Sequence, residues 1–443
     1  MERIQYFIKN CTLIPTFGKD NPSAEDGYEI SGGNPTITYF ESLKSPSISL
    51  TISFIDVDLG ISREGITGGE YLDLRVEVPG YDDFEILPDK HSIMLNSVKD
   101  MKTEARKQIA TLEFVSVESI VNETARVSKR FTGNISDIVS ELLISDKRGV
   151  QTSKNLDKDQ AFNKYTFVGN LKRPFDTIQW LCPKAASTDD ECGFLFYETL
   201  DGYYFKSIKT LLEGEPTVYE KPEKTPTPAG TGDFKIIENN LDTSNDVGMN
   251  CRMGMYANKT IYIDIEEQTT EVVDYKIKEL KLKKSPTLPS KLDTFPTRLM
   301  LRVDDVGVAQ VGAAKSDVQP KSQLAKYQNK SYIRNNLLFS QSLSISIPLN
   351  INLQAGLVIE VKFPLKNEDG SSSTDKYGNE KTDDPSGRYL ISQLRHLMAG
   401  GRSETQLTLI RDVFIPNKDE LTDTGDLIKA DNRQYGNTYP AFR

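Results

Sequence analysis

A strict alternation of apolar and hydroxyl side chains, which occurs twice in the chain, constrains the fold more than any other feature. In residues 47–55, SISLTISFI, the apolar side chains point one way and the hydroxyls the other. Residues 340–348, SQSLSISIP, repeat the pattern. Because successive side chains of a strand point to opposite faces, a period of two predicts a half-buried antiparallel strand. The apolar residues are Ile48, Leu50, Ile52 and Phe54 in the first segment, and Leu343, Ile345 and Ile347 in the second.

The order of elements after each alternating segment is repeated as well. A glycine-led strand follows and stops at a proline, as YLDLRVEVPG at Pro79 and AGLVIEVKFP at Pro364. A further strand, a basic turn and a last strand complete each unit. The shared order predicts a duplicated small β-barrel or sandwich, one copy near residues 35–122 and the other near 335–415. Chance resemblance between two amphipathic β units is the competing interpretation.

The segment between the copies has a different character. Apolar residues spaced three and four apart predict a short amphipathic helix from Ile135 to Leu143. Pro174 in a first turn predicts a second helix, which ends near Pro183. The Asp201–Gly202 pair between two aromatic-rich stretches predicts a β-hairpin. The middle is therefore expected to be a small α+β domain, and a further short helix is expected from about Ser322 to Asn335.

Length and charge limit the classes of function. A chain of 443 residues should hold two to four domains. The net charge of −10 and the pI of about 5.1 disfavour tight binding of a polyanion such as DNA. No secretory signal and no membrane-spanning stretch is visible. The scattered cysteines predict reduced thiols rather than disulfides or a zinc site; they are Cys11, Cys182, Cys192 and Cys251.

The candidate catalytic residues are few. His396 falls on a strand and is expected to be a partly exposed side chain, and His91 is expected on the corresponding strand of the other copy. No nucleophile accompanies either. The acidic groups lack the spacing of a calcium loop and are interpreted as solvated loops; they are Asp56 with Asp58, residues 189–191, Asp304 with Asp305, and Asp383 with Asp384. The prediction is no catalytic, cofactor-binding or metal-binding residue and no cofactor.

Two alternatives to a purely structural role remain open. A cell-wall hydrolase would use carboxylates near the middle domain. A carbohydrate- or receptor-binding module would expose aromatic residues in a groove, for which Tyr197, Tyr203 and Tyr204 are the candidates. A buried position in an aromatic-rich α+β core is the simpler explanation of these tyrosines.

The series of segments resembles the central baseplate hub proteins of contractile-tailed bacteriophages, which are related to the N-terminal part of type VI secretion spike proteins. The resemblance rests on NNLLFSQSLSISIPLNINLQAGLVIEVKFP, SGRYLISQLRHL, TQLTLIRD and the middle run RPFDTIQWLCPKAAS to GFLFYETLDGYYFKSI. It covers most of residues 35–415. The separate motifs are diffuse, and their order is the specific part.

The resemblance implies a mainly β fold with an α+β insertion, in which two similar tube-type antiparallel β-barrels flank a small middle domain. The expected division is an N-terminal extension (1–34), a first barrel (35–122), the α+β domain (123–220), a linker (221–233), further strands and a helix (234–334), a second barrel (335–415) and a tail (416–443).

The implied function is that of a non-enzymatic baseplate hub. Such a hub is a homotrimer with pseudo-sixfold symmetry, which adapts a hexameric tail tube to a trimeric spike and lets DNA pass. The implied partners are the tail tube protein and a trimeric spike or puncturing protein, with tape-measure and baseplate wedge proteins as further candidates. DNA would be present only in transit, helped by a negatively charged ring, and no membrane anchor is expected. The protein would be assembled in the host cytoplasm and reside in the tail baseplate of the virion. No segment after Pro416 resembles a spike domain, so the puncturing tip is expected to be a separate protein.

Overall fold

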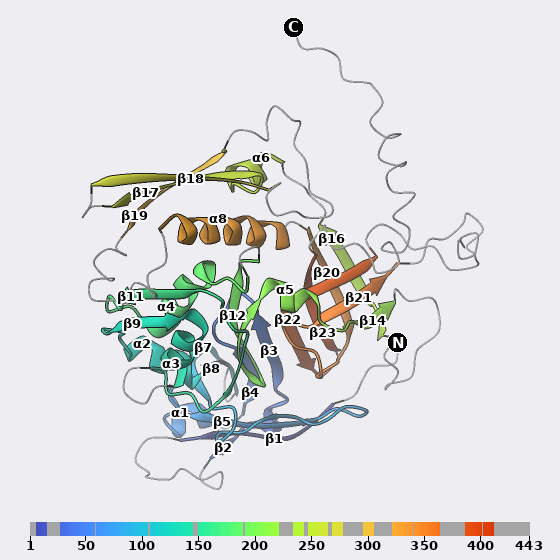
Figure 1. Ribbon diagram of the computed structural model, residues 1–443. Coiled ribbons are helices and arrows are strands. Elements are labelled where there is room, and N and C mark those ends of the chain that lie inside the picture. Colours follow the sequence, from blue (N-terminus) through green and yellow to red (C-terminus); the bar gives the residue numbers. More distant parts are fainter. Residues whose placement is uncertain are drawn as a thin grey trace, which may run out of the picture.

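The computed structural model describes residues 6–15, 27–57, 59–104, 107–144, 149–188, 191–220, 234–242, 247–264, 268–277, 296–304, 321–339, 341–363, 386–400 and 402–411. A 15-stranded sheet dominates it, and three smaller sheets and several helices accompany this sheet (Figure 1). The predicted fold class, mainly antiparallel β with an α+β insertion, is confirmed. The predicted linker 221–233, nearly all of loop 366–387 and the tail 416–443 lie outside the described residues.

The large sheet contains the same four-stranded arrangement twice. The first module consists of β4 (Ser49–Asp56), β5 (Tyr71–Glu77), β7 (Ile93–Glu104) and β8 (Lys107–Ser116), paired in the order β4-β8-β7-β5. The second consists of β20 (Gln341–Pro348), β21 (Val358–Lys362), β22 (Gly387–Ala399) and β23 (Arg402–Arg411), paired in the order β20-β23-β22-β21. All of these pairs are antiparallel, so the two modules share one topology.

The register of the strands is also the same. Leu50 lies opposite Phe114, which lies opposite Leu95. The second module repeats this row with Leu343, Leu409 and Ile391, listed in the same order. Directly after Leu95 and after Ile391 the register shifts by one residue, so each module carries a β-bulge at the same place. Two unrelated amphipathic units would not be expected to share register and bulge, so duplication is the better interpretation.

A glycine precedes the second strand of each module and holds it against the bulge. Gly69 donates its N–H to the carbonyl of Leu95 (2.8 Å), and Gly356 donates to the carbonyl of Ile391 (2.9 Å). Their φ angles are +97° and +91°, in the region that favours glycine. This explains why a glycine leads the strand in both copies.

Two further strands complete one belt: β3 joins the two modules, and β16 extends the second module at its edge. β3 (Thr36–Ser42) pairs with β4 on one side and with β22 on the other, and β16 (Glu238–Asp242) pairs with β20. The resulting eight-strand belt runs β16-β20-β23-β22-β3-β4-β8-β7. Apolar residues of both modules pack in one hydrophobic core beneath it. Burying one face of each strand accounts for the alternation in the sequence.

The remaining strands of the large sheet branch from the belt. β1 (Phe7–Ile14) pairs with β2 (Tyr28–Glu29) and β5, and β5 also pairs with β6 (Phe84–Ile86). β14 (Thr217–Glu220) pairs with β21 and with β15 (Phe234–Lys235). The predicted N-terminal extension 1–34 thus contributes two strands, β1 and β2, to the main sheet, and its residues Cys11, Leu13 and Ile30 lie in the shared core.

The α+β middle domain has the predicted elements around its own core. Its predicted helices are α3 (Ile135–Ile144) and α4 (Pro174–Leu181), and the predicted hairpin is β12 (Phe194–Thr199) with β13 (Gly202–Ser207). The other elements are α2 (Val117–Thr124), β9 (Arg130–Asn134), β10 (Asn155–Lys158), β11 (Lys164–Val168), the 3-10 turn η3 (Cys182–Lys184) and α5 (Ile208–Leu212).

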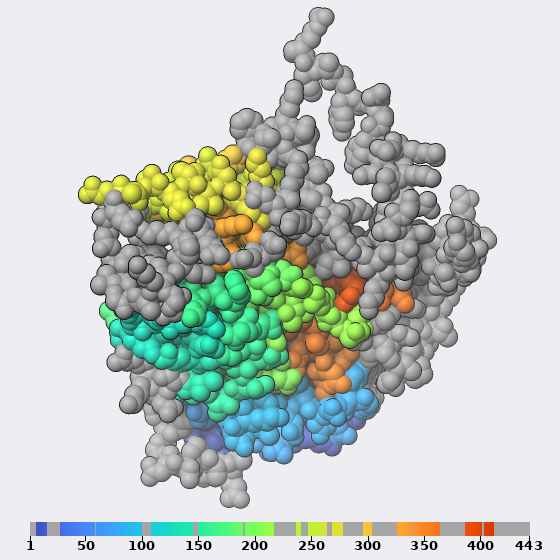
Figure 2. Space-filling view, viewed as in Figure 1, coloured from blue at the N-terminus to red at the C-terminus, as the bar shows by residue number. Residues whose placement is uncertain are grey.

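A separate layer covers the middle domain. The three-stranded sheet β18-β17-β19 packs on α8 (Lys321–Leu338), which in turn contacts η3 (Figures 1 and 2). Its strands are β17 (Ala257–Asp264), β18 (Thr269–Lys276) and β19 (Arg298–Asp304), with α6 (Val247–Arg252) before them. The predicted helix near 322–335 is therefore confirmed. Among the helices described, none is long and apolar enough to cross a membrane.

Candidate functional site

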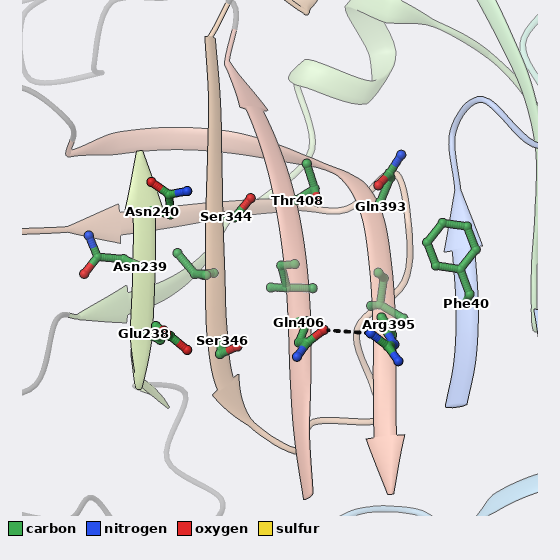
Figure 3. A pocket seen from close by; sticks show the side chains of 13 residues that line it. Phe40, Glu238, Asn239, Asn240, Ser344, Ser346, Gln393, Arg395, Gln406 and Thr408 are labelled. Carbon is green, nitrogen blue, oxygen red and sulfur yellow. Dashed lines mark hydrogen bonds between the residues drawn. The ribbon is translucent and has the colours of Figure 1, made fainter. Parts of the chain in front are cut away.

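The outer face of the eight-strand belt is the most extensive feature built by the duplication. Across the strands, rows of polar residues lie opposite one another, as in Glu238–Ser346–Gln406–Arg395. Figure 3 shows the second-module half of this face, where Ser344, Ser346, Gln406 and Thr408 lie on adjacent strands. The "belt face" comprises the polar residues Glu238, Asn240, Ser344, Ser346, Gln406, Thr408, Gln393, Arg395, Thr38, Ser49, Thr51, Ser53, Thr111, Glu113, Ser97 and Lys99 and the apolar residues Phe40, Ile55, Met94, Ile109, Val115 and Leu397.

The charges on the belt face are few, and two of them form an ion pair. Lys99 donates to Glu113 (2.6 Å), and this hydrogen bond lowers the pKa of Glu113. Arg395 donates to Gln406 (3.4 Å; dashed in Figure 3). The other residues are mainly hydroxyls and amides. Among the described side chains of this face, two acids, Glu238 and Glu113, and two bases, Lys99 and Arg395, carry charge.

The two modules join where β22 changes partners. Before its bulge β22 pairs with β21, and after the bulge it pairs with β3 along the same edge. At the change, Leu43 donates its N–H to the carbonyl of the bulged Ser392 (2.9 Å). The strand β22 thereby belongs to the second module and, through β3, is connected to the first module.

His396 lies buried in this joint, on the core side. Only 1 % of it is exposed, so the expectation of a partly exposed side chain is wrong. It lies opposite Tyr39, and its Nδ1 is 2.9 Å from the hydroxyl of Thr405. Burial lowers the pKa of His396 to about 3, so it is neutral at pH 7. These contacts give it a structural role in the joint.

A buried carboxylate, Glu41, ties the joint to two other parts of the chain. It accepts hydrogen bonds from the Tyr39 hydroxyl (2.7 Å), the Leu200 N–H (3.0 Å) and the Ala355 N–H (2.8 Å). Burial raises the pKa of Glu41 to about 7, although these hydrogen bonds oppose the rise. Leu200 belongs to the middle-domain hairpin turn, and Ala355 precedes β21, so one side chain holds three units together.

A second buried cluster fixes the middle domain on the first module. Lys154 donates to Glu118 (2.9 Å) and Glu198 (2.7 Å), and these side chains are at most 7 % exposed. Glu198 also accepts from the Ser116 hydroxyl (2.6 Å) and the Ile48 N–H (3.0 Å). Burial raises the pKa of Glu198, and Lys154 opposes the rise. Each charged group has a hydrogen-bond partner within the protein, so the cluster is interpreted as structural.

The other histidine is not the counterpart of His396. His91 lies in the turn before β7, where its Nδ1 accepts the Leu87 N–H (3.1 Å). In the first module, the position that corresponds to His396 lies on β7, after the bulge that follows Leu95, in the irregular stretch between Lys99 and Lys102. The expected correspondence is therefore wrong, because periodicity alone does not reveal the bulges that set the register.

The predicted acidic groups do not converge on a site. Asp56 is buried rather than solvated, and it accepts the N–H groups of Gly60 (2.9 Å) and Ile61 (3.0 Å), which fixes the start of the short helix α1 (Gly60–Arg63). Asp58, residues 189–190, Asp305, Asp383 and Asp384 lie outside the described residues. Within the described ranges, no three His, Cys, Asp or Glu residues are grouped to hold a metal ion.

The candidate tyrosines and the cysteines are mostly interior. Tyr197 and Tyr203 are buried, and Tyr204 stacks on Tyr197 with ring centroids 5.2 Å apart. They form no exposed aromatic groove, as the simpler explanation predicts. All four cysteines are free thiols, and burial raises the pKa of Cys11 and of Cys182 to about 12.

Comparison with known proteins locates the fold. No protein-family model and no curated protein matches the chain. Among solved structures, it is similar to the tail protein from Neisseria meningitidis MC58, with a TM-score of 0.51, 12% identity, and coverage of 92% of this chain and 97% of that one. The 43 kDa tail protein of prophage MuSo2 from Shewanella oneidensis aligns with a TM-score of 0.48, 10% identity and coverage of 92% and 100%.

The E. coli c3393 protein, a component of the type VI secretion system, aligns with a TM-score of 0.42, 10% identity and coverage of 92% and 76%. The suspected resemblance is thus confirmed as a likeness of structure: over 92% of its length, the chain has a fold similar to that of the Neisseria tail protein.

Proposed function

We propose that this chain is a non-enzymatic hub in the baseplate of a contractile tail. In this proposal three copies form a ring with pseudo-sixfold symmetry, which adapts a hexameric tube to a trimeric spike. The single observation that carries the proposal is the duplicated module, with the same topology, register and bulge in both copies. Because three chains with two equivalent modules each present six similar units, such a chain can match sixfold and threefold partners at once.

The belt face is the proposed wall of the channel. Its short hydroxyls and amides offer little to hold a polyanion, and its cations Lys99 and Arg395 already interact with Glu113 and Gln406. A DNA backbone binds mainly through unpaired lysines and arginines, so a neutral wall should let DNA pass without retaining it. DNA is therefore proposed only as a transient occupant.

The proposed partners are a tail tube protein on one rim, a trimeric spike protein on the other, and tape-measure and wedge proteins around them. The proposed location is the virion baseplate, after assembly in the host cytoplasm. A receptor-binding role is less well supported because the candidate tyrosines are largely buried. A wall hydrolase is less well supported because the buried acids Glu41 and Glu198 are engaged in structural hydrogen bonds.

Sedimentation velocity and negative-stain imaging of the purified protein test the proposal. We expect a particle of three times the 49.7 kDa chain mass, seen as a ring with a central hole and six similar lobes. A stable monomer at micromolar concentration, or a compact oligomer without a hole, would contradict it.

A further inference from the structure

A cleft opens where three units of the chain meet: the middle domain, the layer that covers it, and the belt. It has a volume of about 880 Å³, within the range of about 300 to 1,000 Å³ that is usual for ligand-binding clefts. Its walls come from α4, η3 and β12, from α6 and α8, and from the turn after β3 and the start of β20 (Figure 1). The "docking cleft" is defined by Leu43, Lys44, Leu195, Met249, Met253 and Phe339.

The wall of the docking cleft is mainly apolar and carries one charge. Met249 is 49% exposed, and Leu195 and Phe339 are partly buried. Lys44 is the only charged residue among the described residues that line the cleft, and its ammonium lies 3.9 Å from the centroid of the Phe339 ring. No described acid forms an ion pair with Lys44. Methionine adapts to irregular apolar partners, so the cleft fits a short apolar peptide that carries an acid.

The C-terminal segment leaves the described part of the chain at the edge of this cleft. The last described strand, β23, ends at Arg411. Its residue Ile410 packs in the same apolar cluster as Leu195 and Phe339. Ile410 also lies opposite Ser342, which lines the cleft. The residues after Arg411 therefore begin beside the docking cleft.

The first residues of this segment match the chemistry of the cleft. Residues 412–416 are DVFIP, an acid followed by three apolar residues and a proline. Because side chains alternate along a strand, continuing β23 by one residue would turn Asp412 to the same face as Ile410. Five extended residues span about 17 Å, more than the edge of about 10 Å of a cube with the volume of the cleft. The segment is therefore long enough to cross it.

We infer that residues 412–416 of the same chain occupy the docking cleft. Asp412 pairs with Lys44, and the apolar side chains of 413–415 pack against Leu195 and Met249. Because the segment is attached beside the cleft, its effective concentration there is in the millimolar range, so a modest affinity is sufficient. The bound segment would hold the middle domain, the covering layer and the belt together. Both members belong to one chain, so the inference does not depend on the proposed hub.

A second run in the C-terminal segment provides a matched comparison. After Pro416, an acid followed directly by two apolar residues occurs once, as Asp426, Leu427 and Ile428. It lies fourteen residues further along the chain than Asp412. A longer tether lowers the effective concentration, so the nearer run is favoured.

Thiol labelling of the full chain tests the occupancy of the cleft. In a Cys251→Ser background, Met249→Cys places a reactive thiol on the wall of the cleft, and residues 412–416 should shield it. Adding Phe414→Ser with Ile415→Ser should raise the rate of maleimide labelling at least tenfold, since the segment then loses most of its apolar contact. Equal rates with and without these two changes would overturn the inference.

The control changes the more distant run by the same chemistry. Leu427→Ser with Ile428→Ser should leave the labelling slow, and a tenfold rise in this control would assign the cleft to the wrong segment and overturn the inference. The labelling rate of the parent should also stay constant on dilution. A rate that rises on dilution would overturn docking within one chain, because the shielding segment would then come from another copy.

Charge reversal tests the ion pair separately. Lys44→Glu should raise the labelling rate roughly three- to fivefold, because like charges then face each other. Lys44→Glu with Asp412→Lys should restore slow labelling. Both variants lack the contact of the lysine with the Phe339 ring, so restoration reports on the pair of charges alone. Labelling that stays fast in the double variant would overturn the pairing of Asp412 with Lys44.

Discussion

The imidazole of His396 stacks on the phenol ring of Tyr39, with ring centroids 5.9 Å apart and planes inclined by 14°. The two rings lie on the paired strands β3 and β22, and Phe84 packs edge-on against both. An interior site of this kind excludes water, which makes the charged imidazole unfavourable. The joint between the modules is therefore sensitive to protonation.

We expect His396 to make the fold acid-sensitive. Its pKa is about 3 in the folded protein and near 6.5 in an unfolded chain, so below pH 6.5 only the unfolded state takes up the proton. As the pH drops below 6.5, the titration of His396 should lower the free energy of unfolding by about 1.4 kcal/mol per pH unit. His396→Phe keeps a ring and removes the titration. Urea unfolding at pH 7, 6 and 5 should show a shallower loss of stability for this variant than for the unmodified protein. An unchanged slope in His396→Phe would contradict this account.

Glu41 should act in the opposite direction. Its pKa is about 7 when folded and about 4.5 when unfolded, so its contribution is present below pH 4.5 and is lost as the pH rises through 7. Glu41→Gln has no such titration, but its amide N–H₂ conflicts with one of the backbone donors at Leu200 and Ala355 at every pH. As the pH rises from 5 to 8, the free energy of unfolding of the variant, measured by chemical denaturation, should increase by about 3 kcal/mol relative to that of the unmodified protein. A pH-independent difference would show that Glu41 does not titrate in this range.

The sequence predicts the local parts of this architecture because their signals are local. The alternation around Leu50 and Leu343, the Asp201–Gly202 turn and Pro174 each specify an element within a few residues. The serines that make the alternation visible also lie on the belt face, so this site could have been identified from them. The sequence analysis did not select these serines, because uncharged hydroxyl side chains do not by themselves indicate a functional site.

The long-range features could not be predicted from the sequence, because no local pattern encodes them. The bulged Ser392 interrupts the period of β22, so Tyr389 and Ile391 face the same core as Leu394. The pairing of β22 with β3 joins residues more than three hundred positions apart. Glu41 appears as an ordinary acid until three distant donors surround it.

Gly356 should tolerate no side chain. A Cβ atom there would lie 2.2 Å from the Tyr197 hydroxyl oxygen, and its φ of +91° disfavours other residues. Gly356→Ala should lower the free energy of unfolding by about 2 to 4 kcal/mol. The control Gly32→Ala meets no atom within 4 Å and should change little. Adding Tyr197→Phe to Gly356→Ala should restore part of the loss; no restoration would assign the cost to the backbone alone.

The Lys154 cluster provides the sharpest test of how the middle domain is held. Lys154→Met removes the cation from between two buried carboxylates, Glu118 and Glu198, and should cost about 3 to 5 kcal/mol at pH 7. Lys209→Met is the matched control, because its ion pair with Glu191 is exposed and should contribute less than about 1 kcal/mol. Lowering the pH to 5 should reduce the penalty of Lys154→Met, since the unpaired acids then bind protons. Equal effects of the two substitutions in urea titrations would mean that the middle domain is held mainly by its apolar contacts, because the buried ions would then stabilise no more than a surface pair.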